Sequence, residues 1–429
     1  MATVAARRPV ARRATNRSAP PLEHRVLVTA TLVLIAYGAV MVYSASSPLG
    51  ALNGAGFGTG ELVVYLAAAA IGLAAMRFFE RFGLSMLSEP LLRLLLLGSF
   101  FLLVVVLIAG PDIGGARRWL AAGPVQFQPS EIVKVVLILY AARYLADHPK
   151  RLNKGIKVAL APLAVVVVPA CGLIYLEPDL GTALVIVLTI GAMLVAAGIP
   201  MRYLGTVAAI GGVGLVLLIS GSAYQRERLT SFLHPSACAA NAACFQTNQG
   251  EIAVGSGGFC GVGLGQGVAK DDYLPEAQTD FILAIVGEEL GVLGVLAVIV
   301  LYGMIAFAGL RTARKAATRY AKLVATGLTS LILCQGLLNI FVVLGIAPLT
   351  GVPLPFISYA PTSLVVLLAS VGVLLNIARP PARELRAVRP RLARVTGAVS
   401  RDTGADRDRR RRDSRARGPR PGGRRRAAG

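Results

Sequence analysis

The sequence predicts an all-α polytopic membrane protein with about ten transmembrane helices and a large extracytoplasmic loop between spans seven and eight. Two observations support this fold class. Hydrophobic residues make up 55% of the 429 residues and charged residues only 15%, which is too apolar for a fold whose surface faces water. Apolar runs of about 20 residues, the length that crosses a hydrocarbon core of roughly 30 Å, recur along the chain.

The apolar runs define one membrane domain, 26–378, between a basic N-terminal tail, 1–25, and an Arg-rich C-terminal tail, 379–429. The C-terminal tail has too few apolar residues to bury a core and is expected to be disordered. The predicted spans cover residues 26–44, 62–80, 94–110, 130–146, 158–175, 181–198, 202–220, 280–308, 322–346 and 361–378.

The formal net charge of +22 reports topology rather than nucleic acid binding. Basic residues concentrate in the tails and in connections that fall on one side of the membrane if ten spans are right. The positive-inside rule makes that side, and both tails, cytoplasmic. A solvated tail attracted to anionic lipid is favoured over a nucleic acid partner. A signal peptide in the first run is disfavoured, because its apolar part exceeds the roughly 7–15 residues of a signal core.

The long connection 221–279 is expected to be functional, because long connections with their own sequence character usually are. Its glycine-rich run, 255–267, does not fit a dinucleotide fingerprint, since no βαβ unit surrounds it. Cys238 and Cys244 both fall in this loop, and a disulfide between them is a hypothesis. The cysteines form no CxxC or Cys/His cluster, which argues against a zinc site.

Charged residues gather at the predicted outer ends of the spans. A charge near the bilayer centre costs on the order of 2.5–3.5 kcal/mol, so such residues need a partner or a task. Their convergence predicts a polar cavity that opens outward, lined by Arg117, Arg118, Glu131, Lys134, Glu177, Asp179, Glu276 and Asp280. The alternative is a set of salt bridges between helix ends, above all for Glu131 with Lys134, one helical turn apart.

Six motifs, in this order, resemble the signatures of the SEDS (FtsW/RodA/SpoVE) family of membrane peptidoglycan glycosyltransferases. They are GARRWL (115–120), FQPSEIVK (127–134), EPDLGT (177–182), AVGSGGFCGVGLGQG (253–267), LPEAQTDFILAIVGEELG (274–291) and PLTGVPLPFISY (348–359). The resemblance covers about 30–378 and leaves both tails outside. It implies ten spans in the cytoplasmic (inner) membrane with both ends cytoplasmic. MVYSASS (41–47) and GEELG (287–291) favour the division branch over the elongation branch.

The resemblance also implies a reaction, the polymerisation of lipid II into glycan strands with release of undecaprenyl diphosphate. Family members are inverting transferases, and their essential aspartate falls on Asp280. As general base, Asp280 would accept the proton of the attacking sugar hydroxyl. It could instead hold a divalent cation, Mg²⁺ or Mn²⁺, against the diphosphate, and the sequence leaves both roles open. A class B penicillin-binding protein, which is a single-span transpeptidase, is the implied partner.

The diphosphate leaving group requires cationic side chains on the same side of the membrane as Asp280. The expected ligands are Arg118 and Lys134 first, then Arg117, with Glu131 orienting Lys134 and Glu276 at the rim of the cavity. Lys270, beside the glycine-rich run, is a candidate ligand for the diphosphate of the second substrate. Glu288 and Glu289 lie further into the eighth span and are expected mainly to serve helix association.

Two other functions stay open. A flippase for the lipid-linked substrate would need a cavity that communicates with both faces of the membrane. A non-catalytic scaffold for division proteins would fit the departure from the family pattern at Ala360-Pro361, where two glycines are usual. Because proline fixes φ and lacks a backbone donor, the start of the tenth span is expected to be built differently from the family pattern.

Overall fold

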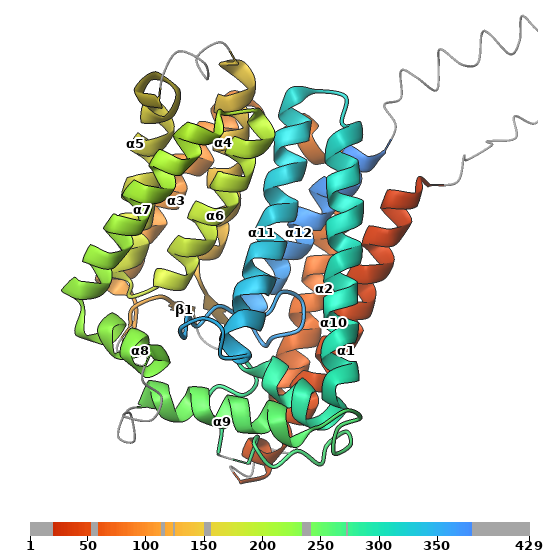
Figure 1. The fold of residues 1–429 in the computed structure, drawn as a ribbon. Coiled ribbons are helices and arrows are strands. Elements are labelled where there is room, and N and C mark those ends of the chain that lie inside the picture. The colour runs from red at the N-terminus through yellow and green to blue at the C-terminus, as the bar shows by residue number, and fades with distance from the viewer. Residues whose placement is uncertain are drawn as a thin grey trace, which may run out of the picture. The chain divides into compact units, whose positions relative to one another are not determined.

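The structure, a computed structural model of the chain, describes residues 20–52, 59–112, 116–122, 125–149, 156–233, 242–271 and 273–379. Within these residues the fold is helical, with one two-stranded β-hairpin (Figure 1). The elements are α1 (Leu22–Leu52), α2 (Thr59–Phe82), η1 (Gly83–Met86), α3 (Glu89–Ala109), β1 (Leu120–Ala122), β2 (Val125–Phe127), α4 (Pro129–Asp147), α5 (Ile156–Leu176), α6 (Leu180–Ala197), α7 (Met201–Gly221), α8 (Ala223–Leu233), α9 (Ala242–Ser256), α10 (Ile282–Lys315), α11 (Arg319–Val343) and α12 (Pro361–Ala378).

Every predicted span coincides with a helix. Among the described residues, eight helices are long and apolar enough to cross a membrane: α1, α2, α3, α6, α7, α10, α11 and α12. α5 contributes a shorter apolar stretch, Leu160–Leu176, and α4 occupies the remaining predicted position. The predicted helical, polytopic fold is therefore confirmed, while the number of crossings stays a prediction. The long helices run side by side, α8 and α9 lie across one end, and α1 begins at the other end, where α12 also finishes (Figure 1).

α7 shows why this fold requires a membrane. All 21 of its residues are described, and none is buried. Ile210, Val213 and Leu217 are each more than 60% exposed. A helix that presents apolar side chains around most of its circumference would be unfavourable in water and is suited to hydrocarbon.

α4 is the converse case, a charged helix that lies inside the protein. It packs against α3, α6 and α11. Lys134 is only 1% exposed, and its Nζ lies 2.8 Å from Oε1 of Glu131. Glu131 and Lys134, within the fourth predicted span, therefore face protein rather than lipid, which avoids the cost of an unpaired charge in hydrocarbon.

Glu80 joins the first, second and last helices at the end opposite α8 and α9. Its buried carboxylate accepts hydrogen bonds from Arg77 at 2.7 Å and from Arg379, and it lies 2.8 Å from Nε2 of His24. The backbone carbonyl of Glu80 accepts a further bond from the Asn376 amide at 2.9 Å. The start of α1 and the end of α12 thus meet at one carboxylate.

The glycine-rich run repairs a break in α10. Gly291 has φ 64° and ψ −162°, outside the helical region, so the intrahelical hydrogen bonds fail around it. Backbone amides of Val262 and Gly263 donate to the carbonyls of Glu288 and Glu289, each at 3.0 Å. In return, amides just after the break donate to the carbonyls of residues 258 and 259. The run 255–267 therefore supplies backbone hydrogen bonds to both sides of the break in α10.

Proline 361 is accommodated without distortion. It stands at the first helical position of α12, where the missing N–H costs nothing and φ near −65° is already suitable. Thr362 and Ser363 follow, and the Thr362 hydroxyl donates to the carbonyl of Gln126 at 3.1 Å, which ties α12 to the β-hairpin. The departure at Ala360-Pro361 therefore produces an ordinary helix start.

We expect the substitution Gly257→Ala to destabilise the protein by about 1–3 kcal/mol, because overpacking strains a tight contact. A Cβ at this position would lie 1.9 Å from the carbonyl oxygen of Gly287, which belongs to α10. Gly255→Ala is the matched control, since a Cβ there meets nothing within 4 Å. The unfolding temperatures of the two variants in detergent check this. Equal temperatures would contradict the close packing of Gly257 against α10.

Candidate active site

A loop between α11 and α12, residues 348–353, carries the centre of the site. It lies at the end of the molecule where α8 and α9 cross (Figure 1). Gly351 has φ +68°, a conformation that favours glycine. A Cβ built on Gly351 would lie 3.8 Å from Nη1 of Arg228 and 3.8 Å from Oδ2 of Asp280. An arginine and an aspartate therefore flank one point of this loop.

Asp280 stands in the turn that precedes α10 and is partly exposed. Loss of solvent around the carboxyl, with the nearby Glu276 carboxylate, raises the pKa of Asp280 to about 6. Thr279 and Arg228 act in the opposite direction. Oγ1 of Thr279 lies 3.1 Å from Oδ1 of Asp280 and 2.8 Å from Oε2 of Glu276. Asp280 is thus an ionised base above pH 6, and the exposed Glu276 lies beside it as the predicted rim residue.

Arg228, on α8, was not among the predicted site residues. Its Nη1 donates to the carbonyl of Leu349 at 3.3 Å, and its guanidinium lies over the Tyr224 ring at 4.5 Å. Burial lowers the pKa of Arg228 from its ordinary value, and the opposing influences include the carboxylates of Asp280 and Asp179. The one local signal was the Tyr224–Arg228 spacing on a short polar helix, which the exposed Arg226 beside it obscured.

Arg118 reaches the turn between α5 and α6. Its Nε donates to the carbonyl of Glu177 at 2.9 Å, and Nη2 donates to the carbonyl of Pro178. In the same turn Asp179 caps α6 by accepting from the amide of Thr182 at 3.0 Å. The structure therefore brings together the predicted Arg118, Glu177 and Asp179. Arg117, next in the chain, is exposed.

Glu177 is fully buried, and neither of its carboxyl oxygens has a hydrogen-bond partner. Burial raises the pKa of Glu177 to about 8, with a smaller contribution from the Asp179 carboxylate and an opposing one from Arg118. At neutral pH the group is thus a protonated acid. Two carboxyl groups at this end of the molecule, Glu177 and Asp280, differ in protonation at pH 7.

Lys134 and Glu131 form a second, fully buried group with an amide of α11. Nζ of Lys134 donates to Oε1 of Glu131 at 2.8 Å and to Oε1 of Gln335 at 3.1 Å. Gln335 in turn donates to the carbonyl of Pro353 at 3.0 Å, so this pair is connected to the 348–353 loop. The predicted contact one helical turn apart is present, and a role in binding substrate stays a prediction.

Lys270 belongs to a separate buried cluster. Its Nζ donates to Glu289 at 2.7 Å and to the Ser44 hydroxyl at 2.9 Å, and Ser44 donates to the same carboxylate. These bonds tie the long loop to α1 and α10, in agreement with helix association as the expected use of Glu289. The charge of Lys270 is compensated there, and its predicted substrate contact stays a prediction.

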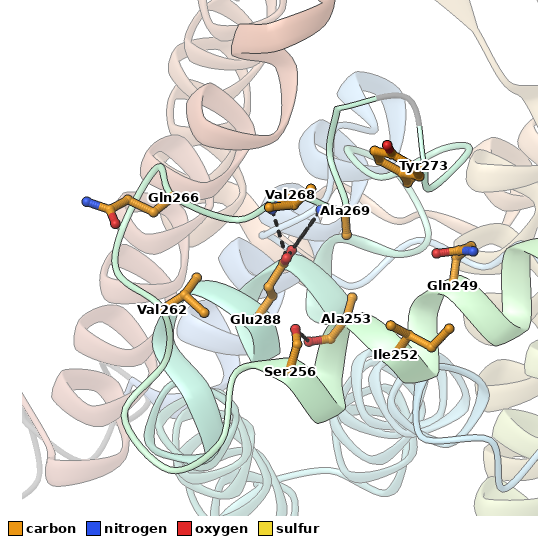
Figure 2. A pocket seen from close by; sticks show the side chains of 10 residues that line it. All are labelled: Gln249, Ile252, Ala253, Ser256, Val262, Gln266, Val268, Ala269, Tyr273 and Glu288. Carbon is orange, nitrogen blue, oxygen red and sulfur yellow. Dashed lines mark hydrogen bonds between the residues drawn. The ribbon is translucent and has the colours of Figure 1, made fainter.

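Glu288 lies beside a surface cavity of about 310 Å³ formed by α9, the glycine-rich run and the start of α10 (Figure 2). Its carboxylate accepts hydrogen bonds from the backbone amides of Val268 at 2.8 Å and Ala269 at 3.2 Å. The lining residues are Gln249, Ile252, Ala253, Ser256, Val262, Gln266, Val268, Ala269, Tyr273 and Glu288. None of the predicted substrate ligands lies among them. A smaller cavity, about 70 Å³, includes Arg228, Leu349 and Thr350 and adjoins the site.

No group of three or more His, Cys, Asp or Glu side chains suited to a metal ion is present within the described part of the chain. Cys244 is buried at the start of α9 and is disulfide-bonded, as predicted for this residue. Its predicted partner, Cys238, lies outside the described residues, so the pairing stays a prediction. Cys171, Cys260 and Cys334 are free.

The fold and the site define the class of protein. It is a multi-pass helical membrane protein that gathers two arginines and several carboxyl groups around one loop at one end of its helices. Residues 24–382 match the family described as "Cell cycle protein", the FtsW/RodA/SpoVE family.

Curated relatives support the same family. Stage V sporulation protein E of Bacillus subtilis is 37% identical over 85% of this chain and 98% of its own length. A probable peptidoglycan glycosyltransferase FtsW of Idiomarina loihiensis is 37% identical over 84% of this chain and 88% of its own.

Solved structures agree with these relatives. A chain of a peptidoglycan synthase complex that coordinates polymerization and crosslinking superposes with a TM-score of 0.67, at 28% identity over 82% of this chain and 96% of that chain. Thermus thermophilus RodA superposes with a TM-score of 0.59, at 27% identity over 85% and 98%. The chain belongs to the FtsW/RodA/SpoVE family, and its predicted enzyme class, peptidoglycan glycosyltransferase, is confirmed.

We expect Glu177 to make stability depend on pH. Because its pKa is raised from 4.5 to about 8, the folded state binds a proton that the unfolded state releases between these values. Its contribution to the free energy of unfolding is complete below about pH 4.5 and is lost as the pH rises through 8. Glu177→Gln, which mimics the protonated acid, should flatten the fall in unfolding temperature between pH 5 and 8.5.

The matched control is Glu89→Gln, at an exposed carboxylate that pairs with Arg93. It should keep the wild-type slope of unfolding temperature against pH. A wild-type slope in Glu177→Gln would show that Glu177 is ionised in the folded protein.

Proposed function

We propose that the protein polymerises lipid II into glycan strands at the outer face of the cytoplasmic membrane and releases undecaprenyl diphosphate. The enzyme class comes from the family, and the substrate is the step beyond it. The observation that carries the proposal is the approach of Asp280 and Arg228 to the same point of the 348–353 loop. A base and a cation side by side suit the attack of a sugar hydroxyl on a sugar diphosphate.

Asp280 is the general base. The 4-hydroxyl oxygen of the acceptor sugar forms a bond to the anomeric carbon of the lipid-linked donor, and the bond from that carbon to the diphosphate breaks. The hydroxyl proton passes to the Asp280 carboxylate, and the electron pair leaves with the diphosphate. A positioned carboxylate of this kind contributes roughly 10²–10⁴-fold to the rate.

Arg228 and Arg118 stabilise the leaving diphosphate. Guanidinium groups match phosphate oxygens in pairs, and they act more strongly where protein excludes water. Both side chains are partly buried and each is within electrostatic range of the site carboxylates. Lys134, Arg117 and Lys270 remain expected contributors from the sequence, of which Lys134 reaches the same loop through Gln335.

A divalent cation, Mg²⁺ or Mn²⁺, would be held by Asp280 and Glu276, whose carboxylates both lie beside Thr279. One or two carboxylates with substrate phosphates is the usual way that Mg²⁺ is bound, so the residues fit such an ion. It would supply positive charge to the diphosphate, in addition to the two arginines.

The orientation of the protein follows from its basic residues. The helix ends opposite Asp280 carry Arg25, Arg77, Arg81, Arg93, Arg311, Arg314, Lys315, Arg319 and Arg379. The positive-inside rule assigns that end, with both termini, to the cytoplasm and Asp280 to the outer side. A class B penicillin-binding protein is the proposed partner, supported by the relative solved within a peptidoglycan synthase complex.

Purified protein mixed with lipid II should produce glycan polymer, and Asp280→Asn should reduce the rate by about 10²–10⁴-fold. The wild-type rate should rise as the pH passes through about 6, because the base works only when ionised. Asp271→Asn is the control and should keep the wild-type rate, because Asp271 is exposed and lies in the connection that precedes α10. Lipid translocation that survives Asp280→Asn would favour a flippase, and no polymer from wild type would favour a scaffold.

Arg228→Gln should lower kcat/KM by about 100-fold, the usual cost of removing a group that stabilises developing negative charge. Arg226→Gln provides a matched control on the same helix, because Arg226 is exposed. Steady-state rates of polymer formation measure both variants. Equal rates for them would exclude Arg228 from the diphosphate site.

A further inference from the structure

Two amide side chains on α11 point toward the site and have no role in the chemistry described above. Gln335 and Asn339 are four residues apart, so they lie on one face of the helix. Both are fully buried, at 0% and 1% exposure. Most buried amides are hydrogen-bonded. The NH₂ groups of these two are, although Oδ1 of Asn339 has no hydrogen-bond partner among the described residues.

Asn339 contacts the backbone of Asp280 directly. Its Nδ2 donates to the carbonyl of Asp280 at 2.6 Å and to the carbonyl of Val352 at 2.9 Å. Because both neighbours are carbonyl oxygens, the NH₂ end of the amide must face them, and both of its hydrogens are used. A single side-chain nitrogen therefore joins the turn before α10 to the 348–353 loop.

Gln335 fastens the next carbonyl of the same loop. Its Nε2 donates to Pro353 at 3.0 Å, while its Oε1 accepts from Lys134 at 3.1 Å. Further back in the loop, the carbonyl of Leu349 accepts from Arg228 at 3.3 Å. The loop is thus held at three carbonyls, two of them by the amides of α11.

The consequence is geometric. Arg228 is attached to the 348–353 loop, and Asp280 is attached to the same loop only one residue beyond Gly351, through Asn339. Asn339 therefore links the backbone of the base to the loop that the cation contacts. We infer that Asn339 is a positioning residue that fixes Asp280 relative to Arg228, with Gln335 holding the loop in register. This inference rests on the proposed function.

The test uses two variants of the full-length protein. Asn339→Leu keeps the approximate volume and removes both donors, and Asn339→Asp keeps the shape but places acceptors against the two carbonyls. Each should lower kcat for lipid II polymerisation by about 10–100-fold, per folded molecule, because small misplacements of catalytic groups have effects of this size. KM should stay close to wild type, since the residue touches no substrate.

Asn376→Leu is the matched control. Asn376 also donates its side-chain amide to a backbone carbonyl, that of Glu80 at 2.9 Å, but at the opposite end of the molecule. It should lower the unfolding temperature and leave kcat unchanged. Wild-type kcat in both Asn339 variants, or a loss confined to KM, would overturn the inference.

A second measurement separates this inference from the proposed function. If wild type forms no glycan, the proposed function fails, and amide hydrogen exchange then decides the role of Asn339. Exchange in peptides that cover 348–353 and 279–282 should accelerate in Asn339→Leu and stay at the wild-type rate in Asn376→Leu. Unchanged exchange in Asn339→Leu would show that the amide holds neither segment.

Discussion

Backbone carbonyls that lack an intrahelical hydrogen bond near the membrane must find partners within the protein, because hydrocarbon supplies none. Three places in this fold meet that constraint with side chains or loops. The break at Gly291 is satisfied by the glycine-rich run, the turn after α5 by Arg118, and the loop before α12 by Arg228, Gln335 and Asn339. Two of these bonds bring arginines beside carboxyl groups, so the candidate active site is built from side chains that also satisfy the backbone.

The cluster around Lys270 and the cluster around Asp280 differ in how fully their charges are compensated. Lys270, Glu289 and Ser44 compensate one another in a closed set of hydrogen bonds, so each charge has a partner within the protein. Around Asp280 the compensation is incomplete. Burial raises the pKa of Asp280 and of Glu177, and the nearby Arg228 and Arg118 oppose this rise only in part. A site that keeps uncompensated charge and an orphan acid suits a charged substrate that supplies the missing partners.

Much of this architecture could be predicted from the sequence. Apolar length alone placed the helices, because a span needs about 20 apolar residues whatever its neighbours are. Asp280 and Arg118 were predicted as site residues through motifs that resemble a family. Arg228 was not, because it lies in a long polar connection beside Arg226, and only folding buries one of the two. The hydrogen bond of Lys270 to Ser44 could not be predicted either, because the two residues are 226 apart in the chain and no local pattern reveals such a contact.

The hydrogen bonds of Asn339 could not be predicted from the sequence for the same reason. An asparagine within an apolar helix indicates a buried hydrogen bond, but not its acceptors, and here these lie 59 and 13 residues away. The start of α12 at Pro361 is the opposite case. The departure from the family pattern predicted an altered helix start, but proline is favourable at the first position of a helix, so the start is ordinary.

The junction at Glu80 has a consequence for the two basic ends of the chain. His24 and Arg379 contact the same carboxylate, so the start of α1 and the end of α12 are held at one place. Neither contact comes from Glu80's own helix: one comes from the start of α1 and the other from the end of α12. Loss of this one carboxylate would therefore release two helix ends that are more than 350 residues apart in the chain.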